Sequence, residues 1–524
     1  MLKRRRKLFG WLLLGMILLP FAFLLFERIR GQIALASFKK ELIMKGEKLA
    51  LEDFVQTFNE SDNGAPEAIA AIEALANGVI LPQNYLPRMR LMLSGRAVIG
   101  FREMEWVESS SYQNGVWIKG RTTNRWDQVA ADLELNAEKL AELRAALKKP
   151  VLNNRVHLSE GLKMKLPHLV PIKSAVNWLG SAAQIALHDG RNGEALENLL
   201  AQLHLVKQLA DDQVIISELV RIAIAAIART DTWEALQADG WQDEQLAALQ
   251  SVWESQTFLS AMSRSFEGER CFIMTSAKQF RESNEETYEM MFGQFATWFG
   301  GGSEEEVWWL KRIDDLPYGE EFLAGMRKQI YCRLWRFAWS HQAEAHNLRD
   351  FQELVELVRA ATKHASYQTF CADLDILLLG VSRKGLYDRL RFPLPDSVSS
   401  LAKAGRRVLK AETDRSLCIT AIALKRHLLR YGRYPNNLAE LVPELLSALP
   451  VDYMDGQPVK YRRNTDGSCT LYSVGEDGKD DDGDLSPGAE GKLNRNLWQR
   501  KDYVWPAPAT SAEVEEYRQT AGMN

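Results

Sequence analysis

The chain has 524 residues, of which 46% are hydrophobic and 26% charged, and its formal net charge is −4. This length is enough for about two to four domains with large cores. The near-balanced charge offers no concentrated basic surface, so we expect no nucleic-acid partner. The five cysteines are scattered and lack any CxxC spacing, so they predict neither a disulfide framework nor a zinc site.

The first predicted element is an apolar segment from Leu8 to Phe26, 19 residues without a charge. This is about the length that an α-helix needs to span the hydrocarbon core of a bilayer. The basic residues Lys3–Lys7 precede it, which favours a cytoplasmic N-terminus and a body outside the cytoplasm. We therefore predict a single-pass protein of the bacterial inner membrane, with residues 1–30 as basic stub and anchor.

A cleavable signal peptide is the alternative to this anchor, with Ala34-Leu35-Ala36 as its cleavage site. The apolar core, however, exceeds the roughly 7–15 residues usual in such peptides. The charged residues Glu27, Arg28 and Arg30 also separate the core from the cleavage site. Both features favour an anchor that is retained.

Residues 31–129 are predicted to be helical with one small hairpin. A helical pattern runs from Ile33 to Asn59, and a second helix begins at Pro66, where proline is tolerated in the first turn. Residues 105–108 and 116–119 alternate between apolar and polar side chains, as paired strands do. The sequence Gln113-Asn-Gly115 between them is a plausible hairpin turn.

Residues 130–410 are predicted to form a large helical body. Apolar residues recur with helical spacing between residues 174 and 237, with a turn at Arg191-Asn-Gly193. The helix from about Val214 to Leu236 is nearly apolar on all sides, so we expect it to be buried. The pair of helices before it resembles a tetratricopeptide-like hairpin. Because no 34-residue period is sustained, an irregular helical bundle remains the alternative that we favour.

An unusual concentration of aromatic residues lies between Met290 and Trp339. It includes tryptophans on both sides of Gly300-Gly-Gly302, namely Trp298, Trp308, Trp309, Trp335 and Trp339. Such residues are either an exposed contact site or core anchors on either side of a loop. We favour the core interpretation.

Motifs for catalysis are scarce. His341 and His346 are five residues apart, whereas a zinc-protease helix needs two histidines four apart on one face. The run Glu267-Gly-Glu-Arg270 is expected to form ion pairs on a helix. We assign no catalytic residue from the sequence, and we expect a non-enzymatic protein.

The region 411–510 is predicted to be a small α+β domain, followed by a frayed tail at 511–524. After a helix that ends near Tyr431, strands are expected at Val459–Arg462 and Cys469–Val474, joined by the turn Asn464–Gly467. Residues 502–506 are expected to add an edge strand. An acidic loop, Glu476–Asp484, follows the second strand.

This acidic loop contains six carboxylates in nine residues, with glycines that permit tight turns. Calcium takes six to eight oxygen ligands, which closely spaced aspartates and backbone carbonyls can supply. The loop is not an EF-hand, because Gly478 and Ala489 would occupy its first and twelfth positions. A solvated acidic loop without an ion is the alternative.

Several short motifs around this loop occur in a characteristic order: Tyr434-Pro435, Gly456-Gln-Pro458, Tyr461 and Leu471-Tyr-Ser-Val-Gly475. With them, residues from about 412 to 510 resemble the C-terminal globular domain of the major pseudopilins of type II secretion. The resemblance implies a structural calcium ion, with Asp477 as a ligand and further ligands from the later aspartates Asp480, Asp481, Asp482 and Asp484.

The chain departs from that family in two places. Asp452-Tyr453 stands where the family has Asp-Pro, and the acidic loop is short. At the N-terminus, Gly10 is not followed by a glutamate at the fifth position, as it is in prepilins. The pseudopilin-like domain is therefore expected on a chain whose N-terminus is not that of a pseudopilin.

The sequence as a whole predicts a membrane-anchored, non-enzymatic scaffold or binding protein of the cell envelope, with partners in the envelope or secretion machinery. Two alternatives stand beside it: an envelope hydrolase whose site is assembled from distant residues, and an atypical component of a pseudopilus. A deep pocket with converging His, Glu or Ser side chains would favour the hydrolase. A long groove or an exposed tryptophan patch would favour the scaffold.

Overall fold

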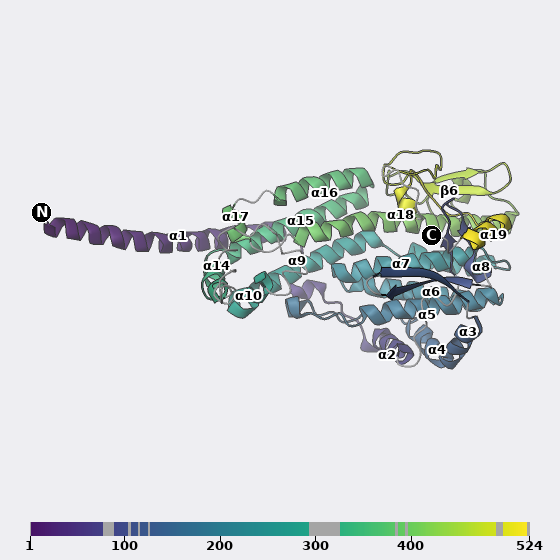
Figure 1. Cartoon of the computed structure of the whole chain (residues 1–524), viewed down its shortest axis with the longest axis horizontal. Coiled ribbons are helices and arrows are strands. Elements are labelled where there is room, and N and C mark those ends of the chain that lie inside the picture. Colours follow the sequence, from purple (N-terminus) through teal and green to yellow (C-terminus); the bar gives the residue numbers. More distant parts are fainter. Residues whose placement is uncertain are drawn as a thin grey trace.

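The molecule is elongated, and a long N-terminal helix projects from one end of a helical body (Figure 1). The computed structural model describes residues 2–76, 88–102, 106–113, 116–123, 126–292, 325–382, 386–392, 397–488 and 496–520. Helices account for 68% of the structure and strands for 5%, which confirms the prediction of a mainly helical fold.

The helices follow one another along most of the chain. Those of the N-terminal half are α1 (Leu2–Met44), α2 (Ala65–Ala76), α3 (Trp126–Leu135), α4 (Ala137–Ala146), α5 (Leu169–His188), α6 (Asn192–Gln208), α7 (Ile215–Leu236) and α8 (Asp243–Glu254). Those of the C-terminal half are α9 (Phe258–Glu282), α10 (Asn284–Phe292), α14 (Cys332–Ala338), α15 (Ser340–Lys363), α16 (Tyr367–Ser382), α17 (Leu386–Arg391), α18 (Ser397–Tyr431) and α19 (Ser511–Thr520).

Three small antiparallel sheets complete the described part of the chain. The first pairs β1 (Arg90–Leu91) with β2 (Ala97–Val98), and the second pairs β3 (Trp106–Gln113) with β4 (Val116–Thr123). The third has the order β5 (Lys460–Arg463), β6 (Cys469–Ser473), β7 (Tyr503–Val504). β3 and β4 pair where the hairpin is predicted, but they end five and four residues later than the predicted strands 105–108 and 116–119, and residues 114 and 115 of the predicted turn lie outside the described residues. β5 and β6 lie within one residue of the predicted tail strands, and β7 lies within the predicted edge strand at 502–506.

The helices α5, α6 and α7 correspond to the three that the apolar period predicts, but α5 begins five residues before the predicted start at 174, and the predicted turn at 191–193 is wrong for Asn192 and Gly193, which belong to α6. α5 is followed by Gly190, whose φ of 73° lies in the left-handed region where glycine is favoured.

α7 is buried along most of its length but not on all sides, since Ile216 is 47% exposed and Ala223 and Ala226 are also exposed. Its buried face also carries charges. Arg221, for example, is 1% exposed and pairs with Glu218 at 2.8 Å.

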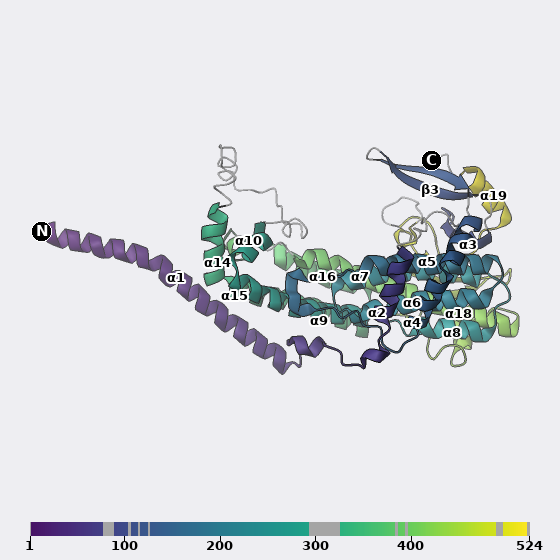
Figure 2. The same ribbon diagram turned by 90° about the horizontal axis from the view of Figure 1, so that it is seen from below.

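The C-terminal half of α1 packs on the body. Its buried or half-buried positions recur every three or four residues, as one helix face does: Leu24, Glu27, Arg28, Gly31, Ala34, Leu35, Phe38, Lys39 and Leu42. Every residue from Leu18 to Phe23 is exposed. The helix therefore leaves the body near Phe23 (Figure 2).

The helical pattern expected up to Asn59 is wrong beyond Met44. Gly46 has a φ of 78°, which turns the chain out of the helix, and the following residues form two short 3₁₀ turns. The predicted membrane span at 8–26 lies partly outside the described residues, because the described side chains begin at Leu18. From that residue on, no described helix combines the length and the apolar character needed to cross a bilayer.

The aromatic-rich segment is described only in part. Trp335 and Trp339 are 2% and 8% exposed and belong to one buried apolar cluster with Met290 and Met291. The core interpretation is confirmed for these two tryptophans. Trp298, Trp308 and Trp309 lie outside the described residues.

The C-terminal region, residues 411–510, is built onto the body through α18. This helix packs against α7, α8 and α9 of the body and also against β6 of the small sheet. Side chains of the sheet region, such as Leu441, Leu471 and Val474, belong to the same buried cluster as those of α5 and α6. The C-terminal region therefore shares one core with the helical body.

The expectation of a frayed end after residue 510 is wrong for residues 511–520, which form α19. Thr510 caps this helix: its hydroxyl accepts from the backbone N–H of Glu513, and the Glu513 carboxylate accepts from the backbone N–H of Thr510. The side chain of Tyr517 is buried. A capping box and one buried aromatic residue give the helix its start and its attachment.

The segment before α19 crosses back to the N-terminal part of the body. Ala97 donates to the carbonyl of Ala507 and accepts from the N–H of Ala509, and Arg96 forms an ion pair with Glu513 at 3.1 Å. Arg500 donates to the carbonyl of Leu93 at 2.7 Å. Residues about 410 positions apart in the sequence are thus joined by backbone hydrogen bonds.

Candidate functional site

The junction between α1 and the body is the most extensively bonded polar region of the described chain. Its first layer is centred on the side-chain amide of Gln342 in α15, which donates to the backbone carbonyl and to the carboxylate of Glu27, both at 2.8 Å. Arg30 and Arg391 donate to the oxygen of the same amide at 3.1 Å. Glu27 is 2% exposed, so the hydrogen bonds from Gln342 and Arg30 replace those that its carboxylate would make to water.

The helices approach closely at this layer because α1 has a glycine there. A Cβ atom on Gly31 would lie 2.8 Å from Cγ of Gln342, so a larger residue would push α1 away from α15. About two turns further along α1, Lys39, together with Arg281 of α9, bonds the buried carboxylate of Glu344 at 2.6 Å. Glu344, which belongs to the run His341–His346, is therefore a structural ion-pair partner.

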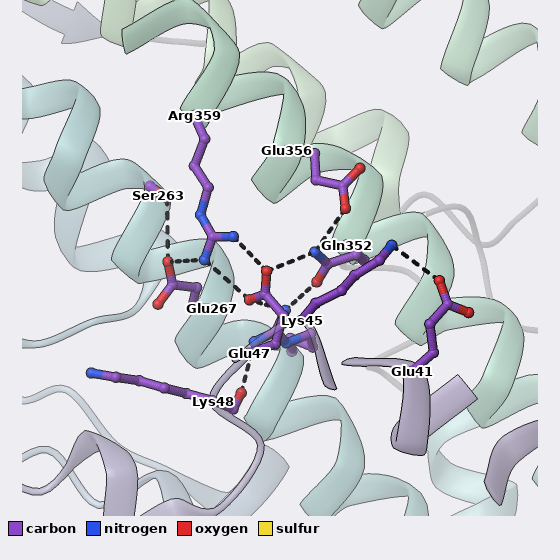
Figure 3. A network of polar contacts seen from close by, with 10 residues as sticks. Glu41, Lys45, Glu47, Lys48, Ser263, Glu267, Gln352, Glu356 and Arg359 are labelled. Atoms are coloured by element: carbon purple, nitrogen blue, oxygen red, sulfur yellow. Dashed lines mark hydrogen bonds and ion pairs between the residues drawn. The ribbon is translucent and has the colours of Figure 1, made fainter. Parts of the chain in front are cut away.

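The third layer is centred on Glu47, just after α1 (Figure 3). Arg270 donates to this carboxylate at 3.0 Å, Gln352 at 3.0 Å, and Arg359 through two nitrogen atoms. Burial alone would raise the pKa of Glu47, but the hydrogen bonds from Arg359, Gln352 and Arg270 outweigh it and lower the pKa to about 2. The carboxylate is therefore charged at neutral pH.

The network reaches the run Glu267-Gly-Glu-Arg270, for which the sequence predicts ion pairs. Arg359 also pairs with Glu267 at 2.8 Å, as Figure 3 shows. Arg270 is completely buried and donates to the backbone carbonyl of Lys48. The prediction of ion pairing is confirmed, but the partners come from α1's end and from α15, and no local pattern points to them.

The five aspartates predicted to bind calcium lie along one loop but make separate contacts. Asp477 accepts from the N–H of Lys479, and Asp480 accepts from the hydroxyl of Tyr472 at 2.9 Å. Asp482 pairs with Arg462 at 2.8 Å, and the ammonium of Lys501 lies 3.7 Å from Asp481 and 2.9 Å from Asp484. Across the described residues, no three His, Cys, Asp or Glu side chains form a group arranged to hold a metal ion.

The backbone of the loop is held by the carboxylate of Asp502, a residue that the sequence does not single out. Asp502, at the start of β7, is fully buried and accepts from the N–H groups of Gly483 and Asp484 at 2.8 and 3.0 Å. Burial raises its pKa to about 6, although the N–H groups of Asp484 and Gly483 oppose the shift. By contrast, the hydrogen bond from Lys501 lowers the pKa of Asp484 to about 2. The carboxylate oxygens of the loop are ligands that suit calcium, while Lys501 already neutralises part of the charge of Asp481 and Asp484.

The motifs that resemble pseudopilins have clear structural roles. The hydroxyl of Tyr461 donates to the carbonyl of Pro435 at 2.7 Å, which joins β5 to the end of α18. Asp452 is fully buried and accepts from the N–H groups of Met454 and Val474 at 3.0 Å and from the hydroxyl of Ser473 at 2.9 Å. Asp452 thus fixes the end of β6, from which the acidic loop begins.

Two pockets lie in the described surface of the body. The smaller, of about 170 Å³, is mainly apolar and lies between α7, α18 and Trp498. The larger, of about 500 Å³, lies between α2 and residues 153–168. Its wall includes His168, which is 7% exposed and lies 2.7 Å from the carboxylate of Asp212. An imidazole oriented by a carboxylate can take up a proton from a reacting group.

Comparison with known proteins returned nothing: no family model matches the chain, and neither does any curated protein or any solved structure.

Proposed function

We propose that the chain is a membrane-anchored scaffold or binding protein of the cell envelope, which carries a pseudopilin-like domain on a rigid helical body. The observation that supports this most is the three-layer polar junction between α1 and α15. It fixes the orientation of a helix whose residues Leu18–Phe26 project from the body with mostly exposed apolar side chains. A retained stem explains why so many specific contacts lie between residues 27 and 47.

The junction also supports retention over cleavage. A cut after Ala36 would remove Glu27, Gly31 and Leu35 from their contacts with the body. It would also separate the apolar segment from the helix turns that orient it. With Lys3–Lys7 inside the cell, the body lies on the outer side of the inner membrane.

Extraction of membranes with alkaline carbonate tests the anchor. The full chain should remain in the membrane pellet, and an Ile17→Asp variant, with a charge in the middle of the span, should be released in part. Added protease should digest the body in spheroplasts of the expressing cells, because it faces outward. Release of the wild-type chain by carbonate, or a body protected in spheroplasts, would refute this part of the proposal.

We propose further that calcium stabilises the acidic loop. The support is the concentration of carboxylates at 476–484, together with the resemblance to pseudopilins. Asp477 and Asp480 are the strongest candidates for ligands, since neither carboxylate has a basic partner among the contacts described above. In this arrangement an ion would only neutralise and order the loop, and no chemical step involves it.

Thermal melts of the full chain in detergent, with calcium and with chelator, test this proposal. The full chain is needed because the C-terminal region shares its core with the body. Free calcium at a hundredfold excess over its Kd should raise the free energy of unfolding by about 2.7 kcal/mol. Asp477→Ala and Asp480→Ala should abolish the difference, while Asp466→Ala, in the β5–β6 turn, should keep it. If the wild-type chain melts at the same temperature with calcium and with chelator, the proposal is wrong and the loop is a solvated acidic loop without an ion.

A second candidate function, an envelope hydrolase, is favoured by one observation: the His168–Asp212 pair in the wall of the larger pocket. Water activated by this imidazole would be the nucleophile. A panel of chromogenic esters, amides and phosphodiesters, with a His168→Gln variant as control, tests the idea. Equal turnover by both proteins would exclude His168 as a catalytic base.

A further inference from the structure

The helical segment before α15 has an exposed apolar face. Ile330, Leu334 and Phe337 are 55%, 38% and 43% exposed, and their spacing of four and three residues places them on one side of the helix. On the opposite side, Cys332, Trp335 and Ala338 are buried in the body. We call Ile330, Leu334 and Phe337 the α14 stripe.

The α14 stripe lies where α1 leaves the body. In both views α14 is at the end of the body from which α1 projects, and it runs crosswise to α1 in Figure 2. Phe337 marks the contact: the guanidinium of Arg28 lies 4.9 Å from its ring centroid and donates to its carbonyl at 3.3 Å. The stripe therefore begins at the level of Arg28 on the stem.

Contacts with α1 also occur inside the predicted membrane span. The ring of Tyr387 lies 6.3 Å from that of Phe23, and Leu24 packs against the buried cluster that contains Trp335 and Trp339. Phe23 and Leu24 belong to the last turn of the span that ends at Phe26. If this span is in the bilayer, the end of the body that touches it lies at the level of the lipid headgroups.

The chemistry of this end suits that level. Aromatic side chains such as Tyr387 and Phe337 are favoured at the boundary between lipid and water, and apolar stripes on crosswise helices bury themselves there. Arg333, which is exposed between Ile330 and Leu334, can bond lipid phosphates. Phe26 and Ile29 add exposed apolar surface on α1 beside it.

We propose that α14 and the π-helical turn before it (Arg327–Tyr331) form an interfacial segment, whose stripe of Ile330, Leu334 and Phe337 lies in the headgroup region of the membrane that α1 crosses. This inference rests on the proposed anchor. It adds a second membrane contact, which would set the tilt of the body relative to the bilayer, since two separate contacts restrict rotation about the stem.

Photo-crosslinking to lipid tests the proposal. The full chain is reconstituted into vesicles of phosphatidylethanolamine and phosphatidylglycerol that contain a phospholipid with a diazirine near its headgroup. After irradiation, lipid adducts are quantified by mass spectrometry on peptides that cover residues 327–338 and 126–135. The second segment is the control, because it ends at Leu135, an exposed apolar residue at the far end of the body.

Adducts on residues 327–338 should exceed those on the control on the order of tenfold, since an interfacial helix contacts lipid continuously. Leu334→Glu should reduce them several-fold, whereas Leu135→Glu should not, and both variants should still float with the vesicles. A chain that floats but labels both segments equally would overturn the inference and leave the anchor intact; a protein partner would then cover the stripe. A wild-type chain that does not float would refute both.

Discussion

Glu47 joins three segments that are far apart in the sequence. Its carboxylate accepts from Arg270 in α9 and from Gln352 and Arg359 in α15, while its backbone continues from the end of α1. Arg270 has no exposure to water, and Glu47 is its anionic partner. The energetic importance of the pair lies in the cost of leaving the buried Arg270 with only the neutral oxygens of Gln352 and Lys48.

Replacing Glu47 by alanine should therefore lower the free energy of unfolding by about 3 kcal/mol, the cost of breaking a buried ion pair. Urea denaturation in detergent, followed by circular dichroism, gives the measurement. The control is Glu41→Ala, because Glu41 pairs with Lys45 at the surface, where both side chains are about half exposed. Its effect should stay below about 0.5 kcal/mol. Equal losses in the two variants would contradict the importance given to burial.

The same carboxylate predicts a loss of stability in acid. The pKa of Glu47 is lowered from 4.5 to about 2 in the folded chain, so the unfolded chain binds the proton first as the pH falls. Its contribution is complete above pH 4.5 and is lost between about pH 4.5 and 2. Melting temperatures across this range should fall less steeply for Glu47→Gln than for the wild type. Parallel slopes would show that other carboxylates dominate.

At the scale of whole elements, regular helices were predictable and irregular attachments were not. The existence of α5, α6 and α7 follows from a strong apolar period, and the end of α5 follows from Gly190, which is a local signal. The end of α1 at Met44 depends on a glycine in the left-handed region, Gly46. The helix α19 depends on the capping box of Thr510 and Glu513. Both are short signals that are easily overlooked in the sequence. These errors lie at ends of helices, where few residues decide the outcome.

Close packing between elements gives a second testable contrast. A Cβ atom on Gly268 of α9 would lie 2.0 Å from the backbone oxygen of Gln213, whereas one on Gly193 of α6 would meet nothing nearer than 3.9 Å. Gly268→Ala should therefore destabilise the chain by about 1–3 kcal/mol, the usual cost of overpacking. Gly193→Ala should be neutral or stabilise slightly, because alanine favours helix. The two variants are compared by their denaturation midpoints. A Gly268→Ala variant as stable as the wild type would mean that α9 can shift to make room for the methyl group.

The candidate sites were predictable only where their residues are neighbours in the sequence. The acidic loop was located correctly because its aspartates are consecutive or nearly so. The residues that bond that loop carry no local pattern: Arg462 comes from β5, and Lys501 and Asp502 directly precede β7. The junction at Gln342 was missed for the same reason, since a single amide on a helix has no signature.

Over the whole molecule, α1 is part of the body as well as a stem. Removing residues 2–42 would uncover Ala345 and Leu348, which pack on Leu35, Phe38 and Leu42, and would take Lys39 from Glu344. We expect that deletion to lower the melting temperature or cause aggregation. Removing only residues 2–22 should leave the melting temperature unchanged, because among the side chains that the structure describes, from Leu18 on, the contacts with the body begin at Phe23. Equal melting of the two truncated chains would show that the junction contributes little.

The hydrogen bonds between residues 93–97 and 500–509 affect the order in which the chain can fold during synthesis. The first of these segments is synthesised some 400 residues before the second, so it must wait for its partner while most of the chain is made. Contacts of such long sequence separation form late and slow the folding of a domain. The body therefore reaches its final state only after its last residues have emerged, and in the interval the unpaired backbone at Ala97 is open to association with other chains.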